Sequence, residues 1–181
     1  MTLDISHINS GWLVILWFGV LGMCMGSFAN VVCHRLPIIR KLGPYQDGVK
    51  LQELVNKHGI YNLSFPRSAC PCCDSKIKSI HNIPFFGWIM LRGKCSKCGE
   101  RISILYPAIE LLFGAVFAGY VAFEGVWLAG LMSLPMMLIA YCLINIRLQN
   151  HKFYLPLVFL YALVMIAQVA LTSFGFSSYA A

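Results

Sequence analysis

Uncharged stretches about as long as a membrane-spanning helix alternate with polar segments along this chain. The first covers residues 12–33, and after a long polar segment three more cover 102–121, 126–146 and 153–176, with Glu110 the one charged residue in all four. A helix needs about 20 predominantly apolar residues to cross the hydrocarbon core of a bilayer. The pattern therefore predicts an all-α integral membrane protein with about four transmembrane helices.

The composition agrees with a membrane protein. Hydrophobic residues make up 59% of the 181 residues and charged residues 12%, which excludes an ordinary soluble domain. The first stretch is expected to remain as a span. A cleavable signal peptide begins with basic residues, whereas residues 1–10 contain Asp4 and neither Lys nor Arg.

Basic residues gather in two of the segments between the predicted spans. Segment 34–101 holds 12 of the 14 Lys and Arg residues and four acidic residues, which gives it a net charge of +8. The other two basic residues, Arg147 and Lys152, lie between the third and fourth stretches, and the opposite face would carry only Asp4 and Glu124. Because basic loops stay in the cytoplasm, we predict that both segments are cytoplasmic and that both termini lie outside.

Two Cys-x-x-Cys pairs lie in the basic segment, Cys70 with Cys73 and Cys95 with Cys98, and 21 residues separate them. The cytoplasm is reducing, so structural disulfides are not expected there. Four thiolates at this spacing match a tetrahedral zinc site of the ribbon type, and because four protein ligands leave no open position, the site is expected to be structural. A redox dithiol pair and unrelated buried thiols are the alternatives. Cys72 is expected to be a bystander, although it could replace Cys73.

These features divide the chain into three parts. Residues 1–33 form the outer N-terminus and the first span, 34–101 a small zinc-ribbon-like cytoplasmic domain, and 102–181 the other three spans. The basic middle part is expected to contact the headgroups of membrane lipids. Nucleic acid also suits a basic zinc ribbon, but no nucleic-acid partner is expected for a segment tethered to the membrane at both ends.

The first span carries a face of small residues that includes Gly22, Gly26 and Ser27. Such a face lets the backbones of two helices approach closely in a membrane. Helix packing and a part in substrate binding are both compatible with it.

Polar residues mark the cytoplasmic end of the same span. Asn30 is expected to face a partner helix or a cavity, because a polar side chain inside a span avoids lipid. The guanidinium of Arg35 is expected to reach the lipid headgroups. Pro37 is expected to end the helix.

The string GSFANVVCHRLP, from Gly26 to Pro37, resembles the GSF-L-N-V-x-x-x-R-L-P signature of the type IV prepilin peptidases. The paired cysteines resemble the zinc-binding segment of that family, and the string from Ser103 to Glu110 resembles the stretch that enters its next span. The three motifs occur in the same order, and together they cover roughly residues 10 to 120.

The resemblance implies a function that composition does not. Members of this family are polytopic enzymes of the bacterial inner membrane. They cut the basic leader from type IV pilins and type II secretion pseudopilins at the cytoplasmic face, and many methylate the new N-terminus with S-adenosylmethionine. The implied partners are therefore prepilin-like proteins, and the implied cofactors are a structural zinc and S-adenosylmethionine.

The chain departs from the family at the residues that hydrolyse the peptide bond. The resemblance places Asn145 where the first catalytic aspartate is expected and Arg147 at the next acidic position, and no Gly-x-Gly-Asp motif or any aspartate follows Asp74. An amide cannot exchange a proton with water as a carboxyl group does. Glu110 is a weak catalytic candidate, because it is the one carboxylate within a predicted span, and a packing or hydrogen-bonding role is at least as expected.

Two functions follow as predictions. In the first, the chain recognises or methylates pilin-like substrates without aspartic peptidase activity. In the second, it is a non-enzymatic assembly subunit of a hetero-oligomeric membrane complex. Like-charge repulsion between a basic leader and the +8 segment weighs against the first.

Overall fold

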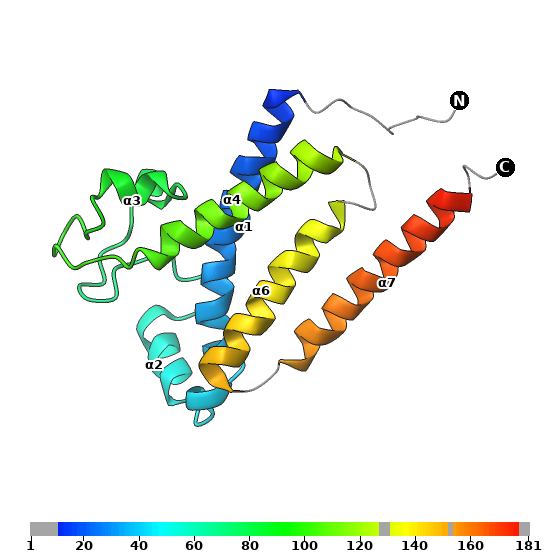
Figure 1. Cartoon of the computed structure of the whole chain (residues 1–181). Coiled ribbons are helices and arrows are strands. Elements are labelled where there is room, and N and C mark those ends of the chain that lie inside the picture. Colours follow the sequence, from blue (N-terminus) through cyan, green and yellow to red (C-terminus); the bar gives the residue numbers. More distant parts are fainter. Residues whose placement is uncertain (1–10, 127–130, 152–153, 178–181) are drawn as a thin grey trace.

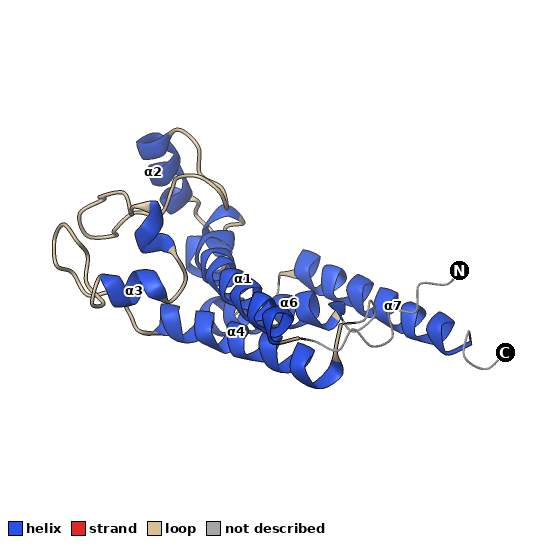
Figure 2. Ribbon diagram, turned by 90° about the horizontal axis from the view of Figure 1, so that it is seen from above, coloured by secondary structure: helices blue, strands red, loops and turns tan. Residues whose placement is uncertain are grey.

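The long helices form one bundle, and shorter elements gather at one end of it. The computed structural model describes residues 11–126, 131–151 and 154–177. All the named elements of this described part are helices, and none is a strand (Figures 1 and 2). The four long helices are α1 (Trp12–Ile39), α4 (Leu105–Glu124), α6 (Ser133–Asn150) and α7 (Leu155–Ser177). The predicted all-α class is confirmed.

Three of the long helices have the length and composition of membrane spans. These are α1, α4 and the first 19 residues of α7. The expected third span corresponds to α6, whose 18 described residues end in polar positions that include Asn145, Arg147 and Gln149. That polar end makes α6 less apolar than the other three, so the fourth span stays a prediction.

The first helix is longer than the sequence pattern indicated. It continues through Pro37 to Ile39, so the expectation that Pro37 ends it is wrong. The helix ends instead where Lys41 takes a positive φ of 52°. The Lys41 N–H donates to the carbonyl of Ile38 (3.2 Å) and the Leu42 N–H to that of Pro37 (2.8 Å), the pattern of a Schellman motif. A proline this close to the end removes one hydrogen bond without stopping the helix.

Small residues allow α1 and α4 to cross at close range. A Cβ added at Gly22 would lie 2.5 Å from the carbonyl oxygen of Phe113 and 2.8 Å from the Cβ of Phe117. On the facing helix, a Cβ at Gly114 would lie 3.0 Å from the carbonyl oxygen of Gly19. Only glycine fits such an approach, which is the packing use of a small-residue face in membranes.

The buried core lies between α1, α4 and α6. Phe113 and Phe117 of α4 pack there with Ala29 and Cys33 of α1 and with Ile146 of α6. Helix α7 contacts α6, where the Gln168 amide donates to the Ser133 hydroxyl (3.2 Å). The outward faces of the long helices remain exposed and apolar, as expected of surfaces that contact lipid.

The segment between α1 and α4 contains the short elements. They are η1 (Gly43–Tyr45), α2 (Val49–His58), η2 (Ser79–Asn82) and α3 (Phe86–Met90). In Figure 1, α2 and α3 lie at the same end of the bundle, away from the start of α1 and the end of α7. This segment holds the four paired cysteines.

Candidate metal centre and its attachment to the helices

The four paired cysteines converge on one point. Their sulfur atoms all lie within 4.8 Å of one another. The Cys70 and Cys98 sulfurs are 3.7 Å apart and those of Cys73 and Cys95 are 3.9 Å apart, so each close contact joins one pair to the other. Cys72 is exposed and lies outside this cluster.

The two Cys-x-x-Cys turns have the same backbone structure. In the first, the Asp74 N–H donates to the carbonyl of Cys70 (2.9 Å), and the Cys70 N–H donates to that of Ser75 (3.0 Å). In the second, the Gly99 N–H donates to the carbonyl of Cys95 (3.0 Å), and the Cys95 N–H donates to that of the residue after Gly99 (2.8 Å). An isolated β-bridge closes each turn: Ala69 with Lys76, and Lys94 with Arg101.

The residue after each second cysteine makes this repeat possible. Asp74 has φ 55° and Gly99 has φ 75°, and both values lie in the left-handed region. Glycine enters that region without strain, and aspartate is one of the few other residues that tolerate it. The two turns are therefore built alike although their sequences differ.

The sulfur positions fit a tetrahedral metal ion such as zinc. With Zn–S bonds of about 2.3 Å, the sulfur atoms of a tetrahedron are roughly 3.8 Å apart. The two contacts of 3.7 and 3.9 Å match that spacing. All four positions would be filled by protein, so a metal here holds the fold together and offers no open position to a substrate.

The ionisation of the thiols also favours a bound cation. Backbone N–H groups, that of Cys98 foremost, lower the pKa of Cys95 to about 6. The Ser75 hydroxyl lowers the pKa of Cys73. At Cys98 the backbone N–H of Glu100 acts in the same direction, but desolvation and the neighbouring sulfurs outweigh it and raise the pKa to about 12. Cys73, Cys95 and Cys98 therefore ionise together near neutral pH only when a cation offsets the repulsion between their sulfurs.

Arg35 connects the first helix to the chain that leads into the metal centre. Its guanidinium donates to the carbonyl of Asn62 (2.9 Å) and to that of Pro66 (2.7 Å). It also lies 5.5 Å from the centre of the Tyr61 ring. The sequence led us to expect Arg35 at the lipid headgroups, and in the structure it holds a loop instead.

Replacing Arg35 with methionine is expected to loosen this loop. The variant loses two hydrogen bonds from a charged donor, and bonds of that kind contribute about 1.5–3 kcal/mol. Hydrogen exchange should show faster exchange of the amides at 60–68. Arg67→Met is the matched control, because Arg67 lies in the same loop and is exposed. Equal exchange in the two variants would contradict this role for Arg35.

Glu110 connects the second span to the start of α3. Its carboxylate accepts a hydrogen bond from the backbone N–H of Phe85 (2.7 Å), and the side chain is 9% exposed. Phe85 has φ 61°, so this turn is held in a conformation that L-residues rarely adopt. The arrangement agrees with the hydrogen-bonding role considered for Glu110.

The signature residues of α1 lie beside the same part of α4. A Cβ at Gly26 would lie 3.0 Å from the Cα of Glu110. The Asn30 amide donates a long hydrogen bond to the carbonyl of Tyr106 (3.4 Å), whereas Ser27 is half-buried on α1 and Pro37 is buried. Gly26 and Asn30 of the signature thus face α4, the helix that carries Glu110.

Asn145 lies in a polar row on α6. Its amide donates to the Tyr141 hydroxyl (3.3 Å), and its carbonyl oxygen accepts from the Gln149 amide (2.5 Å). Both partners belong to the same helix. The structure therefore brings together the cysteines, and separately Gly26, Asn30 and Glu110, while Asn145 makes its two hydrogen bonds within α6.

Sequence reasoning missed several residues that build this region. Tyr61, Asn62 and Pro66 receive Arg35, and the Phe85 N–H meets Glu110. Backbone groups supply most of these contacts, and a backbone group has no signal in the sequence. The Asn62-x-Ser-Phe-Pro string, with its turn-forming residues, was the one available indication.

Comparison with known proteins agrees with this architecture. Residues 20–123 match the model of the bacterial peptidase A24 N-terminal domain. The chain is 44% identical over 119 residues to a prepilin leader peptidase/N-methyltransferase of Stutzerimonas stutzeri, over 64% of this chain and 41% of the relative. It is 40% identical over 111 residues to one of Neisseria gonorrhoeae, over 60% and 38%. It is 37% identical over 136 residues to one of Pectobacterium carotovorum, over 72% and 49%.

The matches cover part of this chain and part of each relative. No solved structure is significantly similar to the chain. The chain spans less than half the length of the curated relatives just named. The domain match covers both turns of the metal centre, the signature of α1 and nearly all of α4. The chain is thus a membrane protein that belongs to the bacterial peptidase A24 N-terminal domain family and is related to the prepilin leader peptidases.

Proposed function

We propose that this chain binds pilin-like proteins in the bacterial inner membrane and does not cut them with an aspartate pair of its own. The relatives are named as prepilin leader peptidases/N-methyltransferases, and the matched domain, residues 20–123, includes the metal-binding segment and most of the spans on either side of it. The main support for the proposal is the joint between α1, α4 and that segment, which Gly26, Asn30, Arg35 and Glu110 make inside the matched domain.

The proposed lack of hydrolysis by these 181 residues rests on where their carboxylates lie. Aspartic hydrolysis needs two carboxyl groups that share one water. Glu110 and Glu124 are the acidic residues beyond residue 100, and 14 residues separate them on one helix, which is roughly 21 Å at 1.5 Å per residue. Glu110 is also occupied by the Phe85 N–H. These 181 residues therefore supply no carboxylate pair within the spans.

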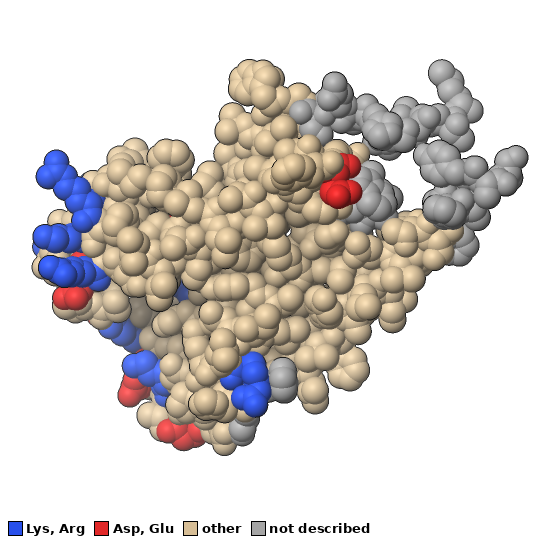
Figure 3. Space-filling model, viewed as in Figure 1, with Lys and Arg blue, Asp and Glu red and all other residues tan. Residues whose placement is uncertain are grey.

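The proposed orientation rests on the distribution of charge. In Figure 3 the visible Lys and Arg residues lie at the end of the molecule that carries α2 and α3. Glu124 is the last residue of α4, at the other end of that helix from the cysteine-containing segment. A positive cytoplasmic face would place the metal centre in the cytoplasm and both termini outside. Zinc is the proposed metal, because four thiolates in a reducing compartment select it.

Reconstitution with a prepilin tests the function directly. The purified chain in lipid vesicles is mixed with a full-length pilin-like protein and a methyl-labelled S-adenosylmethionine. The expected result is co-sedimentation of the pilin with the vesicles and no shortened pilin. Label transfer to the pilin would add methylation to binding. Failure to bind any pilin-like protein, with stable capture of other membrane subunits, would favour the assembly-subunit function.

Restoring one aspartate is expected not to restore cleavage. Asn145→Asp supplies a carboxyl group at the position where the family resemblance expects one, but no second carboxyl group accompanies it. In the same vesicles the variant should bind the pilin as the parent does and leave its length unchanged. A shortened pilin from this variant would contradict the account of the carboxylates. A full-length prepilin leader peptidase is the positive control.

A further inference from the structure

The short helix α3 exposes an apolar face that the metal centre and the spans leave uncovered. Phe86, Ile89 and Met90 are 53%, 48% and 53% exposed, and their spacing of three and four residues places them on one side of the helix. Ile80 and Ile83, just before the helix, are also about half exposed. We call these five residues the α3 patch. Exposed apolar patches mark surfaces that contact proteins or membranes.

The side of α3 opposite the patch packs against the rest of the segment. The Trp88 indole, on the other side of α3, donates to the carbonyl of Ile102 (3.0 Å). A Cβ at Gly93 would lie 2.7 Å from the Trp88 ring, and one at Gly87 would lie 2.1 Å from the carbonyl oxygen of His81. The helix is therefore packed tightly against both η2 and the second cysteine turn.

Glu110 fixes the position of the α3 patch along the helix α4. Its carboxylate binds the N–H of Phe85, the residue before α3, and Glu110 lies five residues inside α4 from Leu105. At 1.5 Å per residue that is about 7.5 Å along the helix. Interfacial helices bury their apolar face about 5–10 Å into the boundary between headgroups and acyl chains. The start of α3 thus lies level with the first turns of a span.

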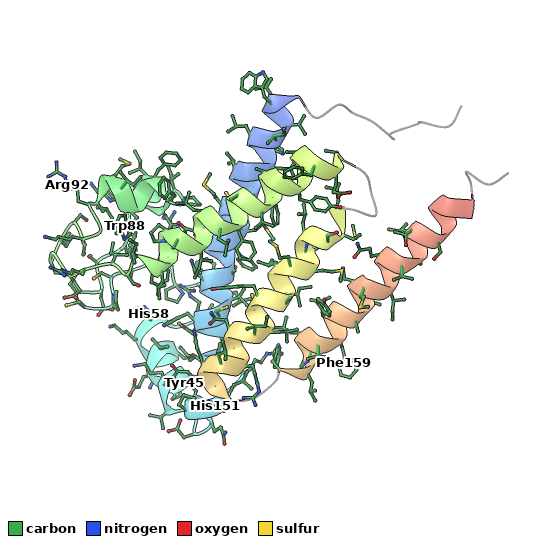
Figure 4. All side chains as sticks on the ribbon, viewed as in Figure 1. Tyr45, His58, Trp88, Arg92, His151 and Phe159 are labelled. Atoms are coloured by element: carbon green, nitrogen blue, oxygen red, sulfur yellow. The ribbon has the colours of Figure 1, made fainter. Side chains whose placement is uncertain are left out.

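The residues around the patch suit contact with the surface of a lipid bilayer. Leu105 and Tyr106, at the start of α4, are 66% and 47% exposed and extend the apolar surface toward the span. Arg92 and Lys94, two and four residues after the end of α3, are exposed. Figure 4 shows Arg92 extending outward at the edge of this region, and Figure 3 shows an uncharged surface over α3 with basic residues along its outer side. Basic side chains beside an apolar face favour anionic headgroups.

We propose that the α3 patch is an interfacial membrane anchor, which dips its apolar face into a bilayer rich in anionic lipid and so sets the position of the metal centre relative to the spans. We choose lipid as the contact because the Phe85–Glu110 hydrogen bond holds the start of α3 beside a span, and because the basic residues Arg92 and Lys94 follow closely after α3. It does not depend on the pilin-binding function, since any substrate would meet the same anchored domain.

Photocrosslinking in vesicles tests the anchor. The photoreactive residue p-benzoylphenylalanine replaces Phe86 in one variant and Val49, on α2, in the control, since Val49 is similarly exposed at 55%. In vesicles of phosphatidylethanolamine and phosphatidylglycerol, mass spectrometry should find several-fold more lipid adduct at position 86. Replacing phosphatidylglycerol with phosphatidylcholine should lower that yield several-fold.

Each other outcome overturns part or all of the proposal. Lipid adduct at 86 no greater than at 49 overturns the anchor, and a yield indifferent to phosphatidylglycerol overturns the role of the basic rim. A protein as the main adduct in native membranes would make the patch a protein-docking surface instead.

Glu110→Leu should lower the lipid adduct at 86 several-fold while the bound zinc is retained, and Glu124→Leu should leave both unchanged.

Discussion

Replacing Cys70 with serine is expected to unfold the segment between α1 and α4 while the long helices stay in the membrane. Cys70 is the one buried sulfur of the four, and it lies 3.7 Å from the sulfur of Cys98. Structural zinc contributes on the order of 10–16 kcal/mol in small domains that fold around it. The segment has little other core, because among its described residues only Gly48, Cys70, Gly87 and Gly93 are buried.

Tryptic digestion in detergent measures this effect. The segment contains many Lys and Arg residues, so an unfolded segment should be cut at once while the helices resist. Cys72→Ser is the matched control, because Cys72 is exposed and lies outside the cluster. The control should keep both its zinc and the resistance of the parent. Resistance of Cys70→Ser equal to that of the control would contradict a structural metal.

Replacing Gly22 with alanine is expected to disrupt the crossing of α1 and α4. The new methyl group would lie 2.5 Å from the carbonyl oxygen of Phe113, and a backbone atom cannot move aside as a flexible side chain can. Overpacking of this kind costs about 1–3 kcal/mol. We expect the free energy of unfolding in detergent to fall by that amount or more, since the two helices must separate.

Gly119→Ala is the control for this change. Gly119 lies on α4, and no atom lies within 4 Å of a Cβ built there. Both variants gain the same intrinsic preference of alanine for helix, about 1 kcal/mol, so their difference isolates the clash. The control should be as stable as the parent or more stable. A Gly22 variant as stable as the Gly119 variant would show that the helices do not pack as described.

The sequence predicted those features of the structure that depend on the chemistry of side chains. The spans follow from uncharged stretches, and the cysteine cluster follows from spacing and compartment. The small residues of α1 were expected to allow a close helix crossing, and the structure contains one at Gly22. Side-chain chemistry decides each of these features, and it can be read one residue at a time.

The sequence was uninformative where backbone geometry decides. The first helix passes Pro37 because Lys41 adopts a left-handed conformation and closes a Schellman motif, which no local preference of lysine predicts. Likewise, η1 and α2 are two separate elements because Gly48, with φ 71°, lies between them. Arg35 was expected at lipid headgroups and binds two carbonyl groups instead.

We infer that four thiolates around one metal ion organise the domain between the first two spans. Zinc analysis combined with X-ray absorption of the purified chain tests it most directly. We expect one zinc per chain and four sulfur scatterers at about 2.3 Å, with no nitrogen or oxygen bound to the metal. A chain that is folded yet free of metal, or a zinc site with a mixed or open shell, would contradict it.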